Sequence, residues 1–158
     1  MTRRERQSSP DRAGGRIAVA AGGGALPVAV VRTLTAKGLD PFVVVIDGEA
    51  AEADYAGAEH ATIAIEEFGP LLKLLRDKGV GRLVMAGSVA RRPRLRAMKW
   101  SLSMLALLPR VTAGLRRGDD GLLRAVIDAF EAAGIRVIGA HEVVPDLLAP
   151  EGLMTRAR

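Results

Sequence analysis

An apolar run that breaks into three consecutive glycines constrains the fold of this chain more than any other feature. The run covers residues 17–21, the glycines follow at positions 22–24, and a proline stands at position 27. Proline fits the first turn of a helix, where its missing N–H is not needed. The stretch therefore predicts a strand, a turn and the start of a helix in direct succession.

The same turn is a candidate anion site. Glycine has no Cβ, so the backbone N–H groups of Gly22, Gly23 and Gly24 can approach a ligand closely. The positive end of the following helix dipole also attracts a phosphate. We include Leu26 and Pro27, at the start of that helix, among the candidate substrate-binding residues. A tight turn without a ligand explains the same residues.

The dinucleotide-binding fingerprint G-x-G-x-x-G fits this turn only in part. Gly22 and Gly24 match its first two glycines, but Pro27 occupies the place of the third. NAD and FAD are therefore disfavoured as ligands. Asp47 lies where such folds place the carboxylate that binds a ribose hydroxyl, although one carboxylate at this position is not specific.

The rest of the sequence alternates between short β-branched runs and helical periods. We predict strands at residues 17–21, 42–46, 61–65, 82–86 and 135–139, and helices at residues 28–37, 67–78, 95–108 and 121–133. Aromatic residues make up only 3%, so Leu, Val, Ile and Ala must build the core, which suits helices packed on a parallel sheet. The pattern predicts an α/β fold: a Rossmann-like, doubly wound parallel sheet of about five strands with flanking helices.

The 158 residues have the length of one domain. We assign residues 16–150 to that domain and residues 1–15, which are basic and polar, to a disordered lead-in. The lead-in lacks the apolar segment of a signal peptide, and no apolar run approaches the roughly 20 residues that span a bilayer. The absence of cysteine excludes a disulfide, a thiol nucleophile and a zinc site with sulfur ligands.

A second candidate loop follows the strand predicted at residues 82–86. Ligands of a parallel sheet bind at the carboxyl ends of its strands, and Gly87, Ser88 and Val89 leave this strand there. Arg91 begins a basic segment whose guanidinium groups match phosphate oxygens in geometry. The segment continues with Arg92, Arg94, Arg96 and Lys99. A solvated helix start explains the basic segment equally well.

Two adjacent carboxylates, Asp119 and Asp120, form a third candidate site. Paired carboxylates suit a hard cation such as Mg²⁺. We favour the simpler interpretation that Asp119 is the N-cap of the helix at residues 121–133 and that Asp120 lies in its first turn. Nucleic acid is disfavoured as a partner despite the net charge of +5, because the basic segment lacks interleaved aromatics and a recognised binding motif.

Four motifs in order carry a resemblance to a known family. They are AGGGALP at residues 21–27, VMAGSVARRP at 84–93, GDDGLLRAV at 118–126 and GAHEVVPDLLAPEG at 139–152. Together they resemble the amino-terminal half of the LpxI-type UDP-2,3-diacylglucosamine pyrophosphatases, and the resemblance covers nearly everything after Gly15.

The resemblance implies a cytoplasmic enzyme of lipid A synthesis in Gram-negative bacteria. Such an enzyme uses Mg²⁺ and water to split the UDP-sugar pyrophosphate into UMP and 2,3-diacylglucosamine 1-phosphate. Its Rossmann-like first domain holds the UDP-sugar lipid against a second domain, which supplies the catalytic acid residue. A homodimer and a peripheral contact with the inner membrane are also compatible with the resemblance.

The chain stops at Arg158, where the second domain of such an enzyme would begin. We therefore expect residues 151–158 to start a linker, and we expect the chain to bind substrate but not to hydrolyse it alone. The partner would be the second domain or a separate chain that carries it, with Leu147, Leu148 and Leu153 as candidate contacts. The alternatives are a non-catalytic sugar-nucleotide or phosphate-binding module and a nicotinamide-dependent oxidoreductase.

Overall fold

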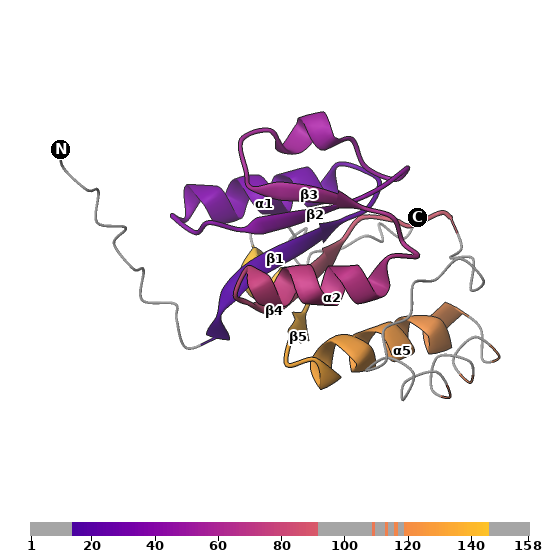
Figure 1. The fold of residues 1–158 in the computed structure, drawn as a ribbon. Coiled ribbons are helices and arrows are strands. Elements are labelled where there is room, and N and C mark those ends of the chain that lie inside the picture. The colour runs from indigo at the N-terminus through magenta and orange to yellow at the C-terminus, as the bar shows by residue number, and fades with distance from the viewer. Residues whose placement is uncertain (1–13, 92–108, 110–112, 114–115, 117–118, 146–158) are drawn as a thin grey trace, which may run out of the picture.

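The computed structural model describes residues 14–91, 109, 113, 116 and 119–145 (Figure 1). Several predictions lie outside these residues: nearly all of the lead-in, the helix at 95–108, the basic residues Arg92, Arg94, Arg96 and Lys99, the candidate contacts Leu147, Leu148 and Leu153, and the linker at 151–158. Among the described helices, none is long and apolar enough to cross a membrane.

The described residues form one sheet of five parallel strands, as the sequence predicted. The strands are β1 (Arg16–Ala21), β2 (Phe42–Ile46), β3 (His60–Ile63), β4 (Val80–Ala86) and β5 (Arg136–Ile138). Their order across the sheet is β3-β2-β1-β4-β5, so β1 is central. The chain thus moves outward from β1 on one side and then crosses to the other side of it, which is the topology of a doubly wound sheet.

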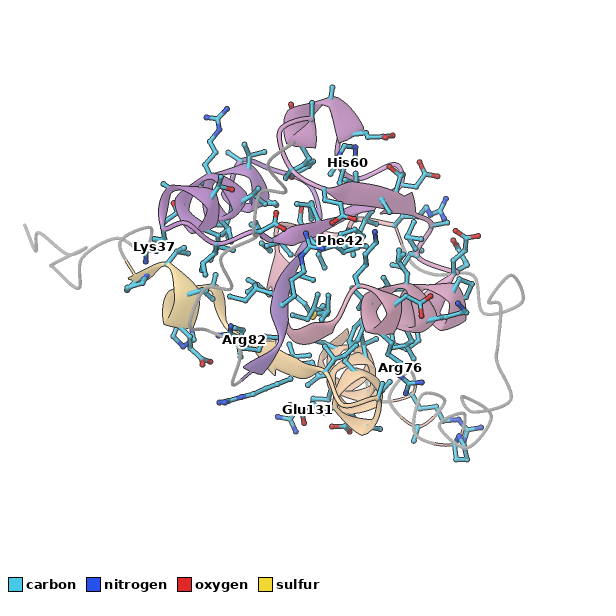
Figure 2. The ribbon with its side chains drawn as sticks, turned by 60° about the vertical axis from the view of Figure 1, so that its left-hand side comes forward. Lys37, Phe42, His60, Arg76, Arg82 and Glu131 are labelled. Carbon is cyan, nitrogen blue, oxygen red and sulfur yellow. The ribbon has the colours of Figure 1, made fainter. Side chains whose placement is uncertain are left out.

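Helices cover both faces of this sheet. The helical elements are α1 (Leu26–Ala36), the 3-10 helix η2 (Glu52–Tyr55), α2 (Phe68–Asp77), α5 (Asp119–Ala132) and α6 (Ala140–Val143). Helix α1 lies on one face, whereas α2 and α5 lie together on the other (Figure 1). Figure 2 shows the side chains between the sheet and the helices. Lys37, at the end of α1, donates a hydrogen bond to the carbonyl of Val143 in α6 at 3.2 Å, which joins these two helices.

Strand β2 shows why the apolar runs form a sheet that is buried on both sides. Val43 and Val45 pack in the layer of α1, whereas Phe42 and Val44 pack in the layer of α2 and α5. All four side chains are at most 1% exposed. A continuous β-branched run is therefore the sequence that a strand between two helical layers requires.

The structure differs from the sequence prediction mainly in short elements and helix starts. The elements η2 and α6, each of 4 residues, were not predicted, because they are too short to show a helical period. The described part of helix α5 runs from Asp119, so this residue lies within the helix and is not a cap that precedes it. A carboxylate in the first turn is favoured by the same dipole that favours a cap, which makes the two positions hard to distinguish in a sequence.

Candidate functional site

The loops that follow β1 and β4 meet at the carboxyl edge of the sheet, which confirms that they lie on the same side. Gly23 and Ser88 form an isolated antiparallel bridge, in which the Gly23 N–H donates to the Ser88 carbonyl at 2.7 Å and the Ser88 N–H donates to the Gly23 carbonyl at 3.0 Å. The Gly22 N–H donates to the Ala86 carbonyl at 2.9 Å. The N–H groups of Gly22 and Gly23 are thus satisfied within the protein, so an approaching anion would not meet them.

Close packing of the two loops explains two of the glycines. A Cβ added to Gly22 would lie 2.5 Å from the Ser88 carbonyl oxygen. A Cβ added to Gly87 would lie 2.5 Å from the Gly23 carbonyl oxygen, and Gly87 also has a φ of +84°. Real Cβ atoms do not approach oxygen this closely, so glycine at these two positions serves the contact between the loops.

Gly24 is explained differently from its two neighbours. Its φ of +96° favours glycine, and an added Cβ would meet nothing within 4 Å, so the space around it is open. Within the part of the chain that the structure describes, no carbonyl accepts the N–H groups of Gly24, Ala25 and Leu26. The first turn of α1 contains no acidic residue, and its N-cap makes no side-chain hydrogen bond. The backbone N–H groups that remain for the predicted anion are therefore those of Gly24, Ala25 and Leu26, and not those of Gly22 and Gly23.

An open groove of about 600 Å³ begins at this helix start. Gly24 and Ala25 line its beginning, and it continues along α1 past Arg32 toward Asp54 of η2. Pro27, the second residue of α1, is buried beside the loop after β4, where its Cγ would lie 2.8 Å from a Cβ on Gly87. Leu26 at the start of α1 is 41% exposed and Val89 in the loop after β4 is 43% exposed, so an apolar side chain faces outward on each side of the contact.

Arg91 is bound by two carboxylates that the sequence analysis did not single out. Its backbone N–H donates to Oε1 of Glu49 at 2.8 Å, and its Nη2 donates to Oε2 of Glu66 at 2.6 Å. The backbone N–H groups of Arg91 and Ala90 hold the pKa of Glu49 below its usual range. Glu66 is buried, whereas the side chain of Arg91 is 52% exposed.

A positional signal for Glu49 and Glu66 was present in the sequence. Glu49 follows β2 and Glu66 follows β3, so both stand at carboxyl ends of parallel strands, where ligands of such sheets bind. The partner of each carboxylate lies on the segment after β4, however, and 42 and 25 residues separate Arg91 from Glu49 and Glu66. Sequence periodicity does not predict which distant loop supplies the partner.

Of the carboxylates predicted from the sequence, only the side chain of Asp47 is described, and it does not join this cluster. Asp47 is exposed just after β2, and its backbone N–H donates to the Ile63 carbonyl at 3.0 Å. Asp119 and Asp120 start α5, but their side chains lie outside the described residues. No group of three or more His, Cys, Asp or Glu side chains that could hold a metal ion occurs among the described residues.

Comparison with known proteins identifies the family. The family model of the LpxI N-terminal domain matches residues 16–147. UDP-2,3-diacylglucosamine pyrophosphatase LpxI of Caulobacter vibrioides is 36% identical over 137 residues, which make up 87% of this chain and 48% of that protein. The chain belongs to the LpxI family. It spans about half the length of the LpxI protein that it matches.

Solved structures support the fold of this LpxI family member and nothing beyond it. WbmG of Bordetella bronchiseptica, solved in complex with NAD, has a TM-score of 0.51 and 15% identity and covers 84% of this chain and 39% of its own. UDP-glucose 4-epimerase of Thermotoga maritima, solved with UDP-glucose, has a TM-score of 0.50 and 16% identity. The match covers 78% of this chain and 37% of the epimerase chain. At such identities the shared feature is the Rossmann-like architecture.

Proposed function

We propose that this chain is the substrate-binding half of a UDP-2,3-diacylglucosamine pyrophosphatase of lipid A synthesis. The reaction would cleave the pyrophosphate of the UDP-sugar lipid and release UMP and 2,3-diacylglucosamine 1-phosphate. The observation that carries the proposal is the match of residues 16–147 to the LpxI N-terminal domain. The carboxyl edge supports it, because N–H donors at Gly24 and Ala25 and the guanidinium of Arg91 suit an anionic substrate.

Binding and hydrolysis are assigned to different parts of the enzyme in this proposal. Attack on phosphorus needs a positioned water and neutralisation of charge at the transition state. The described residues offer anion donors but no cluster of three metal-binding side chains. We therefore propose that a second domain, on the same or a separate chain, supplies the catalytic residue, and that Mg²⁺ ligands are completed outside the described residues. The site would act in the cytoplasm, at the surface of the inner membrane where a lipid substrate resides.

Ligand binding by the 158-residue chain tests the first half of the proposal. We expect UDP to bind more tightly than NADH in calorimetric titrations, because the glycine turn lacks the full dinucleotide fingerprint. Tighter binding of NADH would favour the nicotinamide-dependent alternative and contradict the proposal.

A matched pair of variants tests whether UDP binds at the turn before α1. Gly24 and Gly38 both have a positive φ, +96° and +79°, and an added Cβ meets nothing within 4 Å at either position. Alanine should therefore cost both variants a similar strain of about 1 kcal/mol. We expect Gly24→Ala to weaken UDP binding and Gly38→Ala to leave it unchanged. Equal affinities in both variants would show that the turn before α1 does not meet the ligand.

Release of UMP tests the second half. The chain incubated with UDP-2,3-diacylglucosamine and Mg²⁺ should release no measurable UMP, and addition of the second domain of an LpxI protein as a separate chain should restore release. Robust UMP release by the chain alone, abolished by Asp119→Asn or Asp120→Asn, would show that the catalytic residues lie in this half. Substrate binding without UMP release in any combination would favour a non-catalytic sugar-nucleotide module.

A further inference from the structure

Arg91 is held at two points by carboxylates from two other loops. Glu49, after β2, accepts the backbone N–H of Arg91 at 2.8 Å. Glu66, between β3 and α2, accepts Nη2 of the same residue at 2.6 Å. Three loops of the carboxyl edge thus converge on one residue, and the two contacts fix both its backbone and the end of its side chain.

The burial of Glu66 is unusual for a carboxylate. The residue is 7% exposed and its side chain 10%, whereas the side chain of Arg91 is 52% exposed. Removal of a carboxylate from water is costly unless charged or polar partners compensate it. A cation that needed only to neutralise Glu66 could be buried with it. The guanidinium of Arg91 instead contacts the buried carboxylate of Glu66 while about half of the Arg91 side chain remains exposed to solvent.

We propose that Glu66 is a positioning residue that holds the Arg91 guanidinium ready to bind a phosphate or pyrophosphate group at the carboxyl edge. The inference rests on the proposed function, since it assigns a role within the same binding site. A guanidinium has five N–H donors in a planar fork, so a contact with Glu66 through Nη2 leaves other donors for a second anion. A side chain that is already fixed loses less conformational entropy when the anion binds.

The direction of the effect separates positioning from simple electrostatics. Replacement of Glu66 by Gln removes a negative charge near the expected anion, and by Coulomb's law alone this change would strengthen anion binding. If Glu66 acts by holding Arg91, the same substitution replaces a charge-assisted hydrogen bond by a weaker one, loosens the guanidinium and weakens binding. The two roles therefore predict changes of opposite sign.

The probe is inorganic pyrophosphate, titrated into the 158-residue chain and followed by calorimetry. We expect Glu66→Gln to weaken pyrophosphate binding about tenfold, a typical value for one hydrogen bond to a charged group. The matched control is Asp77→Asn, which makes the same carboxylate-to-amide change in an exposed pair with Lys73 on α2 and should leave binding unchanged. Unchanged or tighter binding by Glu66→Gln would overturn the proposal.

A double-mutant cycle tests whether Glu66 acts through Arg91. Arg91→Lys keeps the charge but loses the fork, so it should weaken pyrophosphate binding, and adding Glu66→Gln to it should weaken binding little further. An equal loss from Glu66→Gln in both backgrounds would show that Glu66 acts independently of Arg91, and would overturn the proposal.

A spectroscopic measurement keeps the proposal testable if Glu66→Gln does not fold. The Nε–H signal of Arg91 should show restricted motion in the wild-type chain without any ligand. The shorter carboxylate of Glu66→Asp should release it. A mobile Arg91 signal in the wild-type chain would contradict positioning.

The outcomes also separate this inference from the proposed function. Failure of the wild-type chain to bind pyrophosphate would overturn the inference, whereas UDP can still bind through its uracil and ribose and so support the proposed function. Pyrophosphate binding that depends on Glu66, combined with no preference for UDP over NADH, would keep the inference and reject the proposed function.

Discussion

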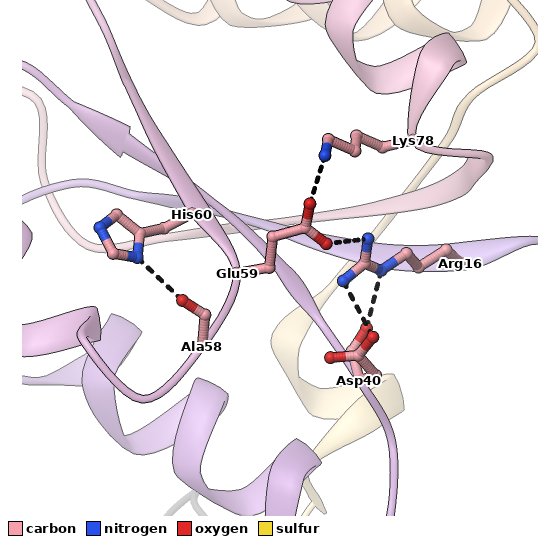
Figure 3. Close-up of polar contacts among 6 residues, drawn as sticks. All are labelled: Arg16, Asp40, Ala58, Glu59, His60 and Lys78. Carbon is pink, nitrogen blue, oxygen red and sulfur yellow. Dashed lines mark hydrogen bonds and ion pairs between the residues drawn. The ribbon is translucent and has the colours of Figure 1, made fainter. Parts of the chain in front are cut away.

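At the amino edge of the sheet the charged side chains bind one another, whereas at the carboxyl edge several donors are left facing outward. The amino edge carries Arg16, Asp40, Glu59 and Lys78, each at the start of a strand or just before one (Figure 3). Arg16 contacts Asp40 at 3.0 Å and Glu59 at 2.7 Å, and Lys78 also contacts Glu59. Both cations lie over the ring of Phe42, with 5.6 Å to its centroid.

The carboxyl edge combines a backbone bridge between two loops with an ion pair, Arg91–Glu66, whose cation is half-exposed. Gly23 and Ser88 join two loops through their main chains, and no carbonyl of the described residues accepts the N–H groups at the start of α1. The guanidinium of Arg91 contacts Glu66 but is still 52% exposed. A cation that is already paired with carboxylates on both sides has few N–H donors left for a ligand. A half-exposed guanidinium that contacts one buried carboxylate still has N–H donors that a ligand can reach. We therefore assign a stabilising role to the amino edge and propose that the carboxyl edge binds the ligand.

Disruption of the backbone contact should have the largest effect on stability. In Gly87→Ala the new Cβ would lie 2.5 Å from the Gly23 carbonyl oxygen, and the residue would also retain a φ of +84°. We expect the free energy of unfolding in urea to fall by about 3 kcal/mol. Gly57→Ala is the control, because no atom lies within 4 Å of its new Cβ and its φ is not positive. A loss below about 1 kcal/mol would show that the two loops can separate without strain.

Removal of the central cation of the amino edge should have a smaller effect, confined to stability. Arg16→Met keeps an apolar stem beside Phe42 but leaves Asp40 without its ion pair and Glu59 with Lys78 alone. The side chain of Arg16 is 20% exposed, so we expect a loss of about 1 to 2 kcal/mol in urea unfolding. Pyrophosphate affinity should not change. A change in affinity as large as that of Glu66→Gln would mean that the two edges are not separate in function.

The sequence predicted the elements of both edges better than the contacts within them. Apolar runs and glycine stops placed β1, β2 and β4 to within two residues, because a strand buried on both faces requires a continuous apolar run. The same reasoning placed the loops at residues 22–24 and 87–89 together, because carboxyl ends of parallel strands share an edge. These predictions depend only on local patterns and on general rules of topology.

The partners of individual polar groups were beyond such reasoning. The glycine turn suggested N–H groups that face a ligand, yet the N–H groups of Gly22 and Gly23 are bound to Ala86 and Ser88. Glu66 has no local feature that distinguishes it from the adjacent Glu67, and only the fold brings it to Arg91. The ion pairs of Arg16 likewise join residues 24 and 43 positions apart. Long-range pairing depends on how loops pack, which periodicity does not encode.

Acid titration should reveal the smallest effect, with the larger part of it at the amino edge. Hydrogen bonds from Lys78 and Arg16 hold the pKa of Glu59 below its ordinary value of 4.5. A folded-state pKa below the unfolded value means that Glu59 stabilises the protein above about pH 4.5 and that this contribution is lost as the pH falls through the folded pKa. Because the Glu59 side chain is 44% exposed, the contribution should stay below about 1 kcal/mol.

Glu59→Gln removes this titration and should flatten the acid limb of stability measured by urea unfolding between about pH 3 and 6. The variant should also lower stability slightly at pH 7, where Arg16 and Lys78 lose their shared carboxylate.

The pKa of Glu49 is lowered as well, by backbone N–H groups at the carboxyl edge, so some acid dependence should persist in the variant. Glu49→Gln should remove that remainder and, unlike Glu59→Gln, weaken pyrophosphate binding by releasing the backbone of Arg91. An acid limb that is steep in Glu59→Gln and flat in Glu49→Gln would reverse the comparison, since the carboxyl edge would then carry the charge-dependent stability that we assign to the amino edge.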